Sequence, residues 1–479
     1  MGFFDKTFRL KDNGTTIKTE IIAGLTTFMT MAYIIALNPN LLTGFGSEGA
    51  DLWNGVFLAT CIASAIGTVL MGFLANKPFV MAPGMGLNSF FAIVVSNIVA
   101  ITGFTYLKSF QSALVIIFIE GIIFLVLSVL NIREKIVEAI PMGVRLGIGP
   151  AIGLMLMNIG FGSNVGVYTA VREDPFFVMR DFFGSLTAKF AKDTMGDDGY
   201  KTMVLTVATM LIGLFVIIAL DKFKVKGSVL CGMIAASIVY WAGEAIFLGI
   251  NPFAGLKDAS FVPPFKDMAN TTLFKLDFKG FVEIGWFTII TLIITFCIID
   301  MFDTIGTLVG TASRANMLDD KGKMPKMKQA LISDAVGTLA GSVTGTSTVT
   351  TFVESASGVE AGGRTGLTAI VAAIMFLLCM FIAPIAAIIP AAATSSALIY
   401  VGILMLSNLK KIAFDDITQM APVAIMLLAM PISGSIGHGI GLALISYTFI
   451  MLVTGKAKEV SILTYVLSVI FLVKFFVPL

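Results

Sequence analysis

The feature that most constrains this chain is a series of apolar runs, each about as long as a membrane-spanning helix. A helix needs about 20 apolar residues to cross the hydrocarbon core of a bilayer. Only 13% of the 479 residues are charged, whereas soluble domains average about 25%. The sequence therefore predicts an all-α polytopic membrane protein embedded in the lipid bilayer. Fourteen runs are placed at 20–39, 55–74, 81–100, 110–130, 143–161, 202–220, 227–249, 282–308, 329–345, 350–362, 365–388, 396–409, 414–434 and 438–455, and a last apolar run covers 459–477.

The composition does not indicate a metal, a cofactor or a nucleic acid as a partner. The four cysteines fall inside apolar runs, without the spacing of metal ligands, and the single histidine, His438, excludes a His-rich metal site. The net charge is +2 and the basic residues are scattered, so no nucleic-acid footprint is present. We expect neither a metal site nor a cofactor.

The distribution of basic residues predicts the orientation of the chain. With the N-terminus inside, most of the 32 lysines and arginines, Arg133 among them, fall in inner connections. Short inner loops of membrane proteins carry this excess. We therefore expect 1–19 to form a cytoplasmic N-terminus. Because no cleavable signal is visible and the chain is compact, we expect a multi-pass protein of a bacterial cytoplasmic membrane.

Two internal resemblances indicate that the chain is duplicated. Ile152-Gly-Leu-Met-Leu resembles Val401-Gly-Ile-Leu-Met at an offset of 249, and Ser64-Ala-Ile-Gly-Thr68 resembles Asp334-Ala-Val-Gly-Thr338 at an offset of 270. Together they predict two halves of about seven spans each. An odd number of spans gives the halves opposite orientations, and such inverted repeats are typical of secondary transporters.

Matching places in the two halves are poor helix formers. Pro78, Pro83 and Gly84 interrupt span 3, and the hydroxyl-rich segment 341–351 interrupts span 10. We expect each to be a short extended segment that enters a half-helix, the first near Gly84 and the second near Glu354. Free backbone groups at membrane depth are tolerated only where protein or a ligand satisfies them.

Carboxylates inside apolar sequence are the candidate functional groups, because an ionisable side chain at membrane depth is costly. Asp303 and Glu354 are the main candidates, with Asn88 at the matching place in the first half. Carboxylate and amide groups suit a flat heterocycle that presents adjacent N–H and C=O groups. Removal from water disfavours the charged carboxylate, so these groups also suit proton coupling. Asp300 is a further proton-coupling candidate, or alternatively a partner of a neighbouring helix.

Other side chains are assigned lesser roles. Phe352 and Met29, like Phe28 and Phe296, offer surfaces on which a planar substrate would stack. Each of these is also explained by packing. We interpret Glu120 as a structural partner of another helix and Asp334 as lying at the cytoplasmic end of its span.

Four motifs resemble the AzgA-like branch of the nucleobase–cation symporter (nucleobase–ascorbate transporter) family. The resemblance covers essentially the whole chain and implies fourteen spans in two inverted seven-span repeats. It also implies a core of spans 1–4 and 8–11, a gate of spans 5–7 and 12–14, and purine uptake driven by protons. Dimerisation through the gate is an expectation from the family alone. The motifs begin at Gly24 (Gly-Leu-Thr-Thr-Phe-Met-Thr-Met-Ala-Tyr-Ile), Ala82 (Ala-Pro-Gly-Met-Gly-Leu-Asn-Ser-Phe-Phe), Asp300 (Asp-Met-Phe-Asp-Thr-Ile-Gly-Thr-Leu) and Thr350 (Thr-Thr-Phe-Val-Glu-Ser).

The resemblance assigns positions residue by residue. Asp303 takes the acidic position of span 8, Glu354 that of span 10, and Asn88 lies in the span-3 motif together with Gly84. Relatives that take uracil or xanthine have histidine where this chain has Thr304, and usually glycine where it has Val353. The chain therefore departs from those branches, and hypoxanthine, guanine or adenine is the expected substrate.

Domain boundaries follow from the same division, and several alternatives stay open. We expect core segments at 20–130 and 282–388 and gate segments at 143–249 and 396–479. The alternatives are a SulP-like anion transporter of the same architecture, which should favour a cationic site, and a channel. An enzyme is not expected, because no nucleophile–base set is present. The preferred purine, sodium in place of the proton, and a full span at 459–477 stay open.

Overall fold

The computed structural model describes residues 3–44, 49–133, 136, 139–162, 188–257, 259–314, 317–319 and 324–476. Apart from two three-residue strands, the regular elements in these residues are helices. Eleven helical segments of the described residues are long and apolar enough to cross a membrane. Helices that are shorter or less apolar than these occupy the predicted spans near 329–345, 350–362 and 414–434. The prediction of an all-α polytopic protein is confirmed.

The chain forms two compact units, and each takes one part from either half of the sequence. The first unit comprises Met1–Lys135 and Ser260–Ala383, and the second comprises Ile136–Ala259 and Pro384–Leu479. The assignment of core and gate roles to the units stays a prediction.

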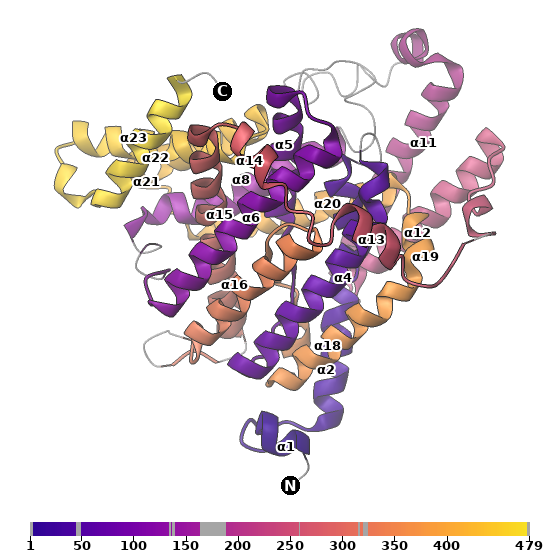
Figure 1. Ribbon diagram of the computed structural model, residues 1–479, viewed down its shortest axis with the longest axis horizontal. Helices are drawn as coiled ribbons and strands as arrows, with labels where there is room; N and C mark the ends of the chain where they lie inside the picture. Colours follow the sequence, from indigo (N-terminus) through magenta and orange to yellow (C-terminus); the bar gives the residue numbers. More distant parts are fainter. Residues whose placement is uncertain are drawn as a thin grey trace. The chain divides into compact units, whose positions relative to one another are not determined.

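The first unit contains both strands. Within it α2 packs against α18, and α6 runs beside α16 (Figure 1). Its main elements are α1 (Phe3–Phe8), α2 (Ile17–Met31), α3 (Ile34–Leu42), α4 (Trp53–Leu70), β1 (Met81–Pro83), α5 (Met85–Thr102), α6 (Tyr106–Val129), α13 (Phe265–Thr271), α14 (Phe278–Glu283), α15 (Trp286–Arg314), α16 (Met327–Thr344), β2 (Val349–Thr351), α17 (Ser355–Glu360) and α18 (Gly366–Cys379).

The second unit is built from helices alone in its described residues. Its most extensive helix–helix contacts join α8 to α20 and α21 to α22. Its elements are α8 (Met142–Phe161), α11 (Ala188–Lys222, interrupted at Gly196), α12 (Ser228–Gly243), α20 (Ala391–Met405), α21 (Ile417–Ser433), α22 (Ile436–Val453) and α23 (Ile462–Phe476). A further helix, α19 (Ala383–Ala387), begins at the boundary between the units.

The last apolar run forms a short helix. α23 has 15 residues, which gives it a length of about 22 Å, less than the roughly 30 Å of a hydrocarbon core. It packs against α22, where the Thr448 and Ser468 hydroxyls lie 2.8 Å apart. The described part of 459–477 is therefore an addition to the fourteen spans, too short to cross a bilayer by itself.

Glycines at matching positions of the two repeated motifs lie in contact with each other. A methyl group at Gly67 on α4 would lie 3.5 Å from Gly337 Cα on α16, and the reverse distance is also 3.5 Å. In the second unit, a methyl group at Gly153 would lie 2.5 Å from Gly402 O, and the reverse distance is again 2.5 Å. Equal reciprocal distances are what a local two-fold axis produces, so each unit is organised around its repeated motif.

Candidate functional site

The two breaks in the helices pair with each other as β1 and β2. The strands are antiparallel, with Ala82 opposite Thr350 at the centre of the register. Beyond the strands, Phe352 N donates to Val80 O at 3.0 Å and Gly84 N donates to Thr348 O at 3.1 Å. Backbone groups released by the broken helices are thus satisfied by one another, as membrane depth requires. The β-branched residues of β2 favour this extended form.

The ends of both strands lead into helices, as the sequence predicts. Gly84 has extended backbone and precedes the first residue of α5, and Glu354 immediately precedes α17. The pair is anchored from α4, where the Thr68 hydroxyl lies 2.9 Å from Met81 N. Thr338, the copy of Thr68 in the second repeat, donates to Val349 O at 3.4 Å. Equivalent threonines of the two repeats, Thr68 and Thr338, therefore hold β1 and β2 respectively.

Asp303 lies beside the junction of β1 and α5. A methyl group at Gly84 would lie 3.4 Å from Asp303 Oδ2 and 2.6 Å from Thr350 Cγ2. Asp303 is partly exposed, and among the described residues no donor is found within hydrogen-bonding distance of its carboxylate. Asp303 and Glu354 are near enough to interact electrostatically. Gly84 therefore provides the space into which the Asp303 carboxylate extends.

Glu354 is held by a residue that the sequence analysis did not select. The Tyr33 hydroxyl, at the break between α2 and α3, donates to Glu354 Oε1 at 2.8 Å. Tyr33 is almost fully buried, whereas Glu354 is partly exposed. The contact orients the carboxylate and leaves its second oxygen for another donor. The motif beginning at Gly24 includes Tyr33, but nothing in the sequence indicates that its partner is Glu354.

Asn88 is buried and occupied by protein contacts. Its Nδ2 donates to Pro83 O at 3.2 Å, and its Oδ1 accepts a hydrogen bond from the Ser347 hydroxyl. It therefore ties α5 to the segment before β2. This geometry favours a positioning role over direct contact with a ligand.

Of the apolar residues that were predicted to contact the substrate, some have exposed side chains and others are buried. Met29 is 42% exposed and Val353 is 49% exposed, whereas Phe352 is only 6% exposed. Phe296 packs against Phe90 with ring centroids 4.6 Å apart, so its surface is already covered. Met29 and Val353 are thus available as apolar contacts.

Asp300 does not join Asp303 but belongs to a buried charged group. Arg133 Nη2 lies 2.7 Å from Asp334 Oδ2 and 3.5 Å from Asp300 Oδ2, and all three side chains are fully buried. The alternative role considered for Asp300, pairing with a neighbour, is therefore observed. Arg133 is not a loop cation, and Asp334 is not exposed at the end of its span. Both differ from the sequence interpretation because their partners are distant in sequence.

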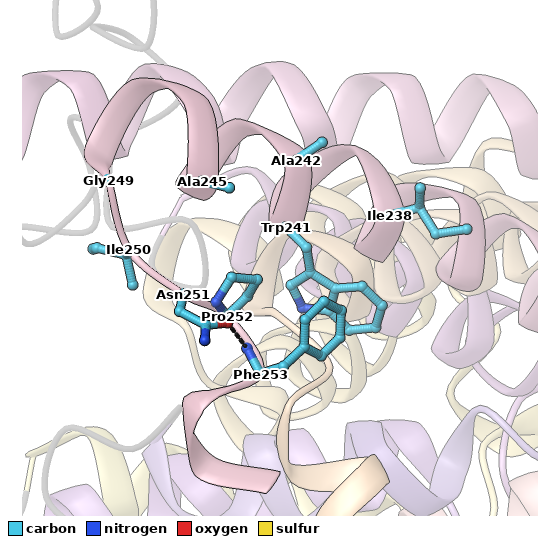
Figure 2. Close-up of a pocket in the computed structure, with 9 residues that line it drawn as sticks. All are labelled: Ile238, Trp241, Ala242, Ala245, Gly249, Ile250, Asn251, Pro252 and Phe253. Carbon is cyan, nitrogen blue, oxygen red and sulfur yellow. Dashed lines mark hydrogen bonds between the residues drawn. The ribbon is translucent and has the colours of Figure 1, made fainter. Parts of the chain in front are cut away.

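A recess of about 660 Å³ lies in the second unit, beside the end of α12. Figure 2 shows the rings of Trp241 and Phe253 close together among the residues that line it, and their centroids lie 5.1 Å apart. Trp241 Nε1 donates to Ile388 O at 3.1 Å. No charged side chain lines the recess among the described residues. It offers an apolar surface and lacks the carboxylates that mark the first unit.

Known proteins resemble this chain over nearly its whole length. The profile of the Permease family matches residues 18–188 and 186–439. The adenine permease AdeP of Escherichia coli K12 is 35% identical over 99% of this chain and 96% of its own. The guanine/hypoxanthine permease PbuG of Bacillus subtilis 168 is 35% identical, with 98% of each chain covered.

A solved structure shares the fold. The transmembrane domain of the cyanobacterial bicarbonate transporter BicA superposes with a TM-score of 0.62, covering 89% of this chain and 97% of that one. Its sequence is only 14% identical, so this similarity concerns the fold alone.

Proposed function

This chain belongs to the Permease family, and we propose that it imports purine nucleobases by proton symport with alternating access. The observation that carries the proposal is the pair of carboxylates, Asp303 and Glu354, at the two ends of the paired strands. Both side chains are partly exposed, and each keeps at least one oxygen without a donor among the described residues. The purine substrates of AdeP and PbuG point to the same ligand class.

The chemistry of the site fits a purine base. Ionised carboxylates accept hydrogen bonds only, so Asp303 and Glu354 would accept from ring and exocyclic N–H groups. Tyr33 would hold Glu354 in place, and Asn88 would hold α5 against the strands. The exposed side chains of Met29 and Val353, with the edge of Phe352, would cover the faces of the ring.

The proposed transport couples purine import to a proton and requires movement of the spans. Carboxyl groups suit the binding of a coupling proton, because removal from water favours their protonated form. Asp303, Glu354 and Asp300 are the candidates for this role. Alternating access would follow from movement of the core spans against the gate spans. A cytoplasmic N-terminus and a location in the cytoplasmic membrane belong to the same proposal. Dimerisation through the gate stays a prediction.

Anion transport is the main rival, because BicA shares the fold. An anion site would need an available cation, or a helix N-terminus that has no carboxylate beside it. Arg133 is fully buried and paired with Asp334, and the ionisable groups at the ends of the strands are carboxylates. AdeP and PbuG, which share about a third of the sequence, are named as purine permeases, which favours a base over an anion. A channel is disfavoured because two carboxylates, one of them held by Tyr33, suit a binding site better than a pore lined by rings of charge.

Binding of radiolabelled adenine, guanine and hypoxanthine to the purified full-length protein tests the site. We expect Asp303→Asn and Glu354→Gln each to weaken binding by about 1.5–3 kcal/mol, the range for hydrogen bonds to charged groups. Asp267→Asn is the control, because this carboxylate accepts from Asn54 Nδ2 at 2.7 Å elsewhere in the same unit. Unchanged affinity in both site variants would contradict the assignment.

A further inference from the structure

A second ionisable centre lies behind the paired strands. Its guanidinium is that of Arg133, just after α6, which also donates from Nη1 to Leu331 O at 3.4 Å and lies 3.9 Å from the centre of the Phe124 ring. Its carboxyl groups come from three different helices. We call this set the buried cluster: Arg133, Asp300 of α15, Asp334 of α16 and Glu120 of α6, all fully buried.

The charges of the buried cluster do not balance. One guanidinium lies beside two carboxylates, those of Asp300 and Asp334. A third buried carboxyl group, Glu120, lies on α6, the helix that leads to Arg133. Glu120 Oε2 accepts from the Thr348 hydroxyl at 2.8 Å, but Oε1 is buried without a partner in the described part of the chain. The other ionisable groups nearby are Cys297 and Asp303, both on α15. Uncompensated buried charge is strongly unfavourable, so the cluster favours taking up protons.

The hydrogen bonds around Thr304 point to the same conclusion. Its Oγ1 lies 2.9 Å from Asp300 Oδ1, 2.8 Å from Asp334 Oδ1 and 2.7 Å from the Thr350 hydroxyl. Thr304 has one hydrogen to donate, and Thr350 can donate a second. With both carboxyl groups ionised, one short oxygen–oxygen contact lacks a hydrogen. A proton on Asp300 or Asp334 satisfies all three contacts.

The buried cluster is connected to the strands by two hydroxyl groups. Thr350 lies at the centre of β2, opposite Ala82, and its methyl group is next to Gly84. Thr348 donates from its side chain to Glu120 and accepts at its carbonyl from Gly84 N. A change in protonation therefore alters contacts to the segment that borders Asp303.

We propose that the buried cluster is the site that binds the coupling proton, and that Thr348 and Thr350 transmit its protonation state to the purine site. The inference rests on the proposed purine transport. The only bond that forms is O–H on a carboxylate, with a proton taken from water on one side of the membrane. The same bond breaks when the proton is returned on the other side. Asp303 and Glu354 then serve substrate binding, and coupling depends on groups that do not touch the substrate.

Proteoliposomes containing the full-length protein separate the two roles. Exchange of external labelled purine for internal purine requires binding and translocation, whereas accumulation driven by an imposed pH gradient also requires coupling. We expect Asp300→Asn and Glu120→Gln to keep exchange close to that of the unmodified protein. We expect accumulation to fall by about tenfold, within the range typical of coupling between sites. Two variants are used because either one alone could fail to fold, and Asp267→Asn should retain both activities.

The outcomes are distinguishable. Unchanged pH-driven accumulation in both variants overturns the inference and leaves purine transport intact. Loss of exchange together with accumulation in both variants also overturns it, since the cluster would then serve the fold. Absence of purine exchange by the unmodified protein instead contradicts the proposed function itself.

Discussion

Gly84 illustrates how closely single residues determine the candidate site. Any side chain here would meet the Thr350 methyl group at 2.6 Å, and Thr350 is itself held through its hydroxyl by Thr304. We expect Gly84→Ala to destabilise the protein by about 1–3 kcal/mol, the usual cost of overpacking. We also expect it to weaken purine binding, because the strand or Asp303 is displaced. Equilibrium binding to the purified variant measures the effect.

Gly310→Ala provides the matched control for Gly84. Gly310 lies on α15, the helix of Asp303, and has nothing within 4 Å of the added methyl group. It should bind purine like the unmodified protein. Equal affinity of the Gly84 and Gly310 variants would show that the space at Gly84 is not needed.

Sequence patterns predict some site residues and miss others for a physical reason. Asp303 and Glu354 are visible because each interrupts apolar sequence, where a carboxylate is costly. Arg133 follows an apolar run and reads as a loop cation. Its partners Asp300 and Asp334 are 167 and 201 residues away. Only the packing of α15 and α16 against α6 distinguishes a buried guanidinium from an exposed one.

At the scale of elements, the glycines of the repeats determine how closely helices approach. Gly153 on α8 and Gly402 on α20 face each other, and a methyl group on either would lie 2.5 Å from the carbonyl oxygen of the other. We expect Gly153→Val and Gly402→Val to destabilise the protein by similar amounts, about 1–3 kcal/mol. The temperature at which purified protein loses its monodisperse state measures the loss.

The control for these variants is Gly255→Ala in the same unit, where nothing lies within 4 Å of the added group. Strongly unequal losses in the two valine variants would contradict the reciprocal contact.

The elements themselves were largely predictable from apolar length and helix-breaking residues. The prolines and glycines near Gly84 and the hydroxyl-rich run before Glu354 predicted both extended segments. In the second segment, however, residues 341–344 belong to α16, which ends at Thr344. The pairing of β1 with β2 was not predicted, because the two segments lie in different halves of the chain. Nor did the sequence show that the Asn88 side chain forms hydrogen bonds with Pro83 and Ser347. These bonds favour a positioning role for Asn88 over direct contact with a ligand.

At the scale of the whole molecule, duplication explains why the two units each draw on both halves of the chain. The weak repeats at offsets of 249 and 270 correspond to direct contacts, Gly153 with Gly402 and Gly67 with Gly337. Each motif therefore resembles its partner because both copies occupy equivalent places around a local axis. The fold is shared with a bicarbonate transporter, so the fold does not determine the substrate. In the proposed function, the carboxylates at the strand ends do so.

Uptake of labelled bases by whole cells tests directly whether the protein imports purines with protons. Cells lacking their own nucleobase permeases would express the chain and receive labelled adenine, guanine, hypoxanthine, xanthine or uracil, with and without a protonophore. We expect saturable uptake of at least one of the first three bases, abolished by the protonophore, and no uptake of xanthine or uracil. Absence of purine uptake by protein that reaches the membrane, or purine uptake indifferent to the protonophore, would contradict the proposal.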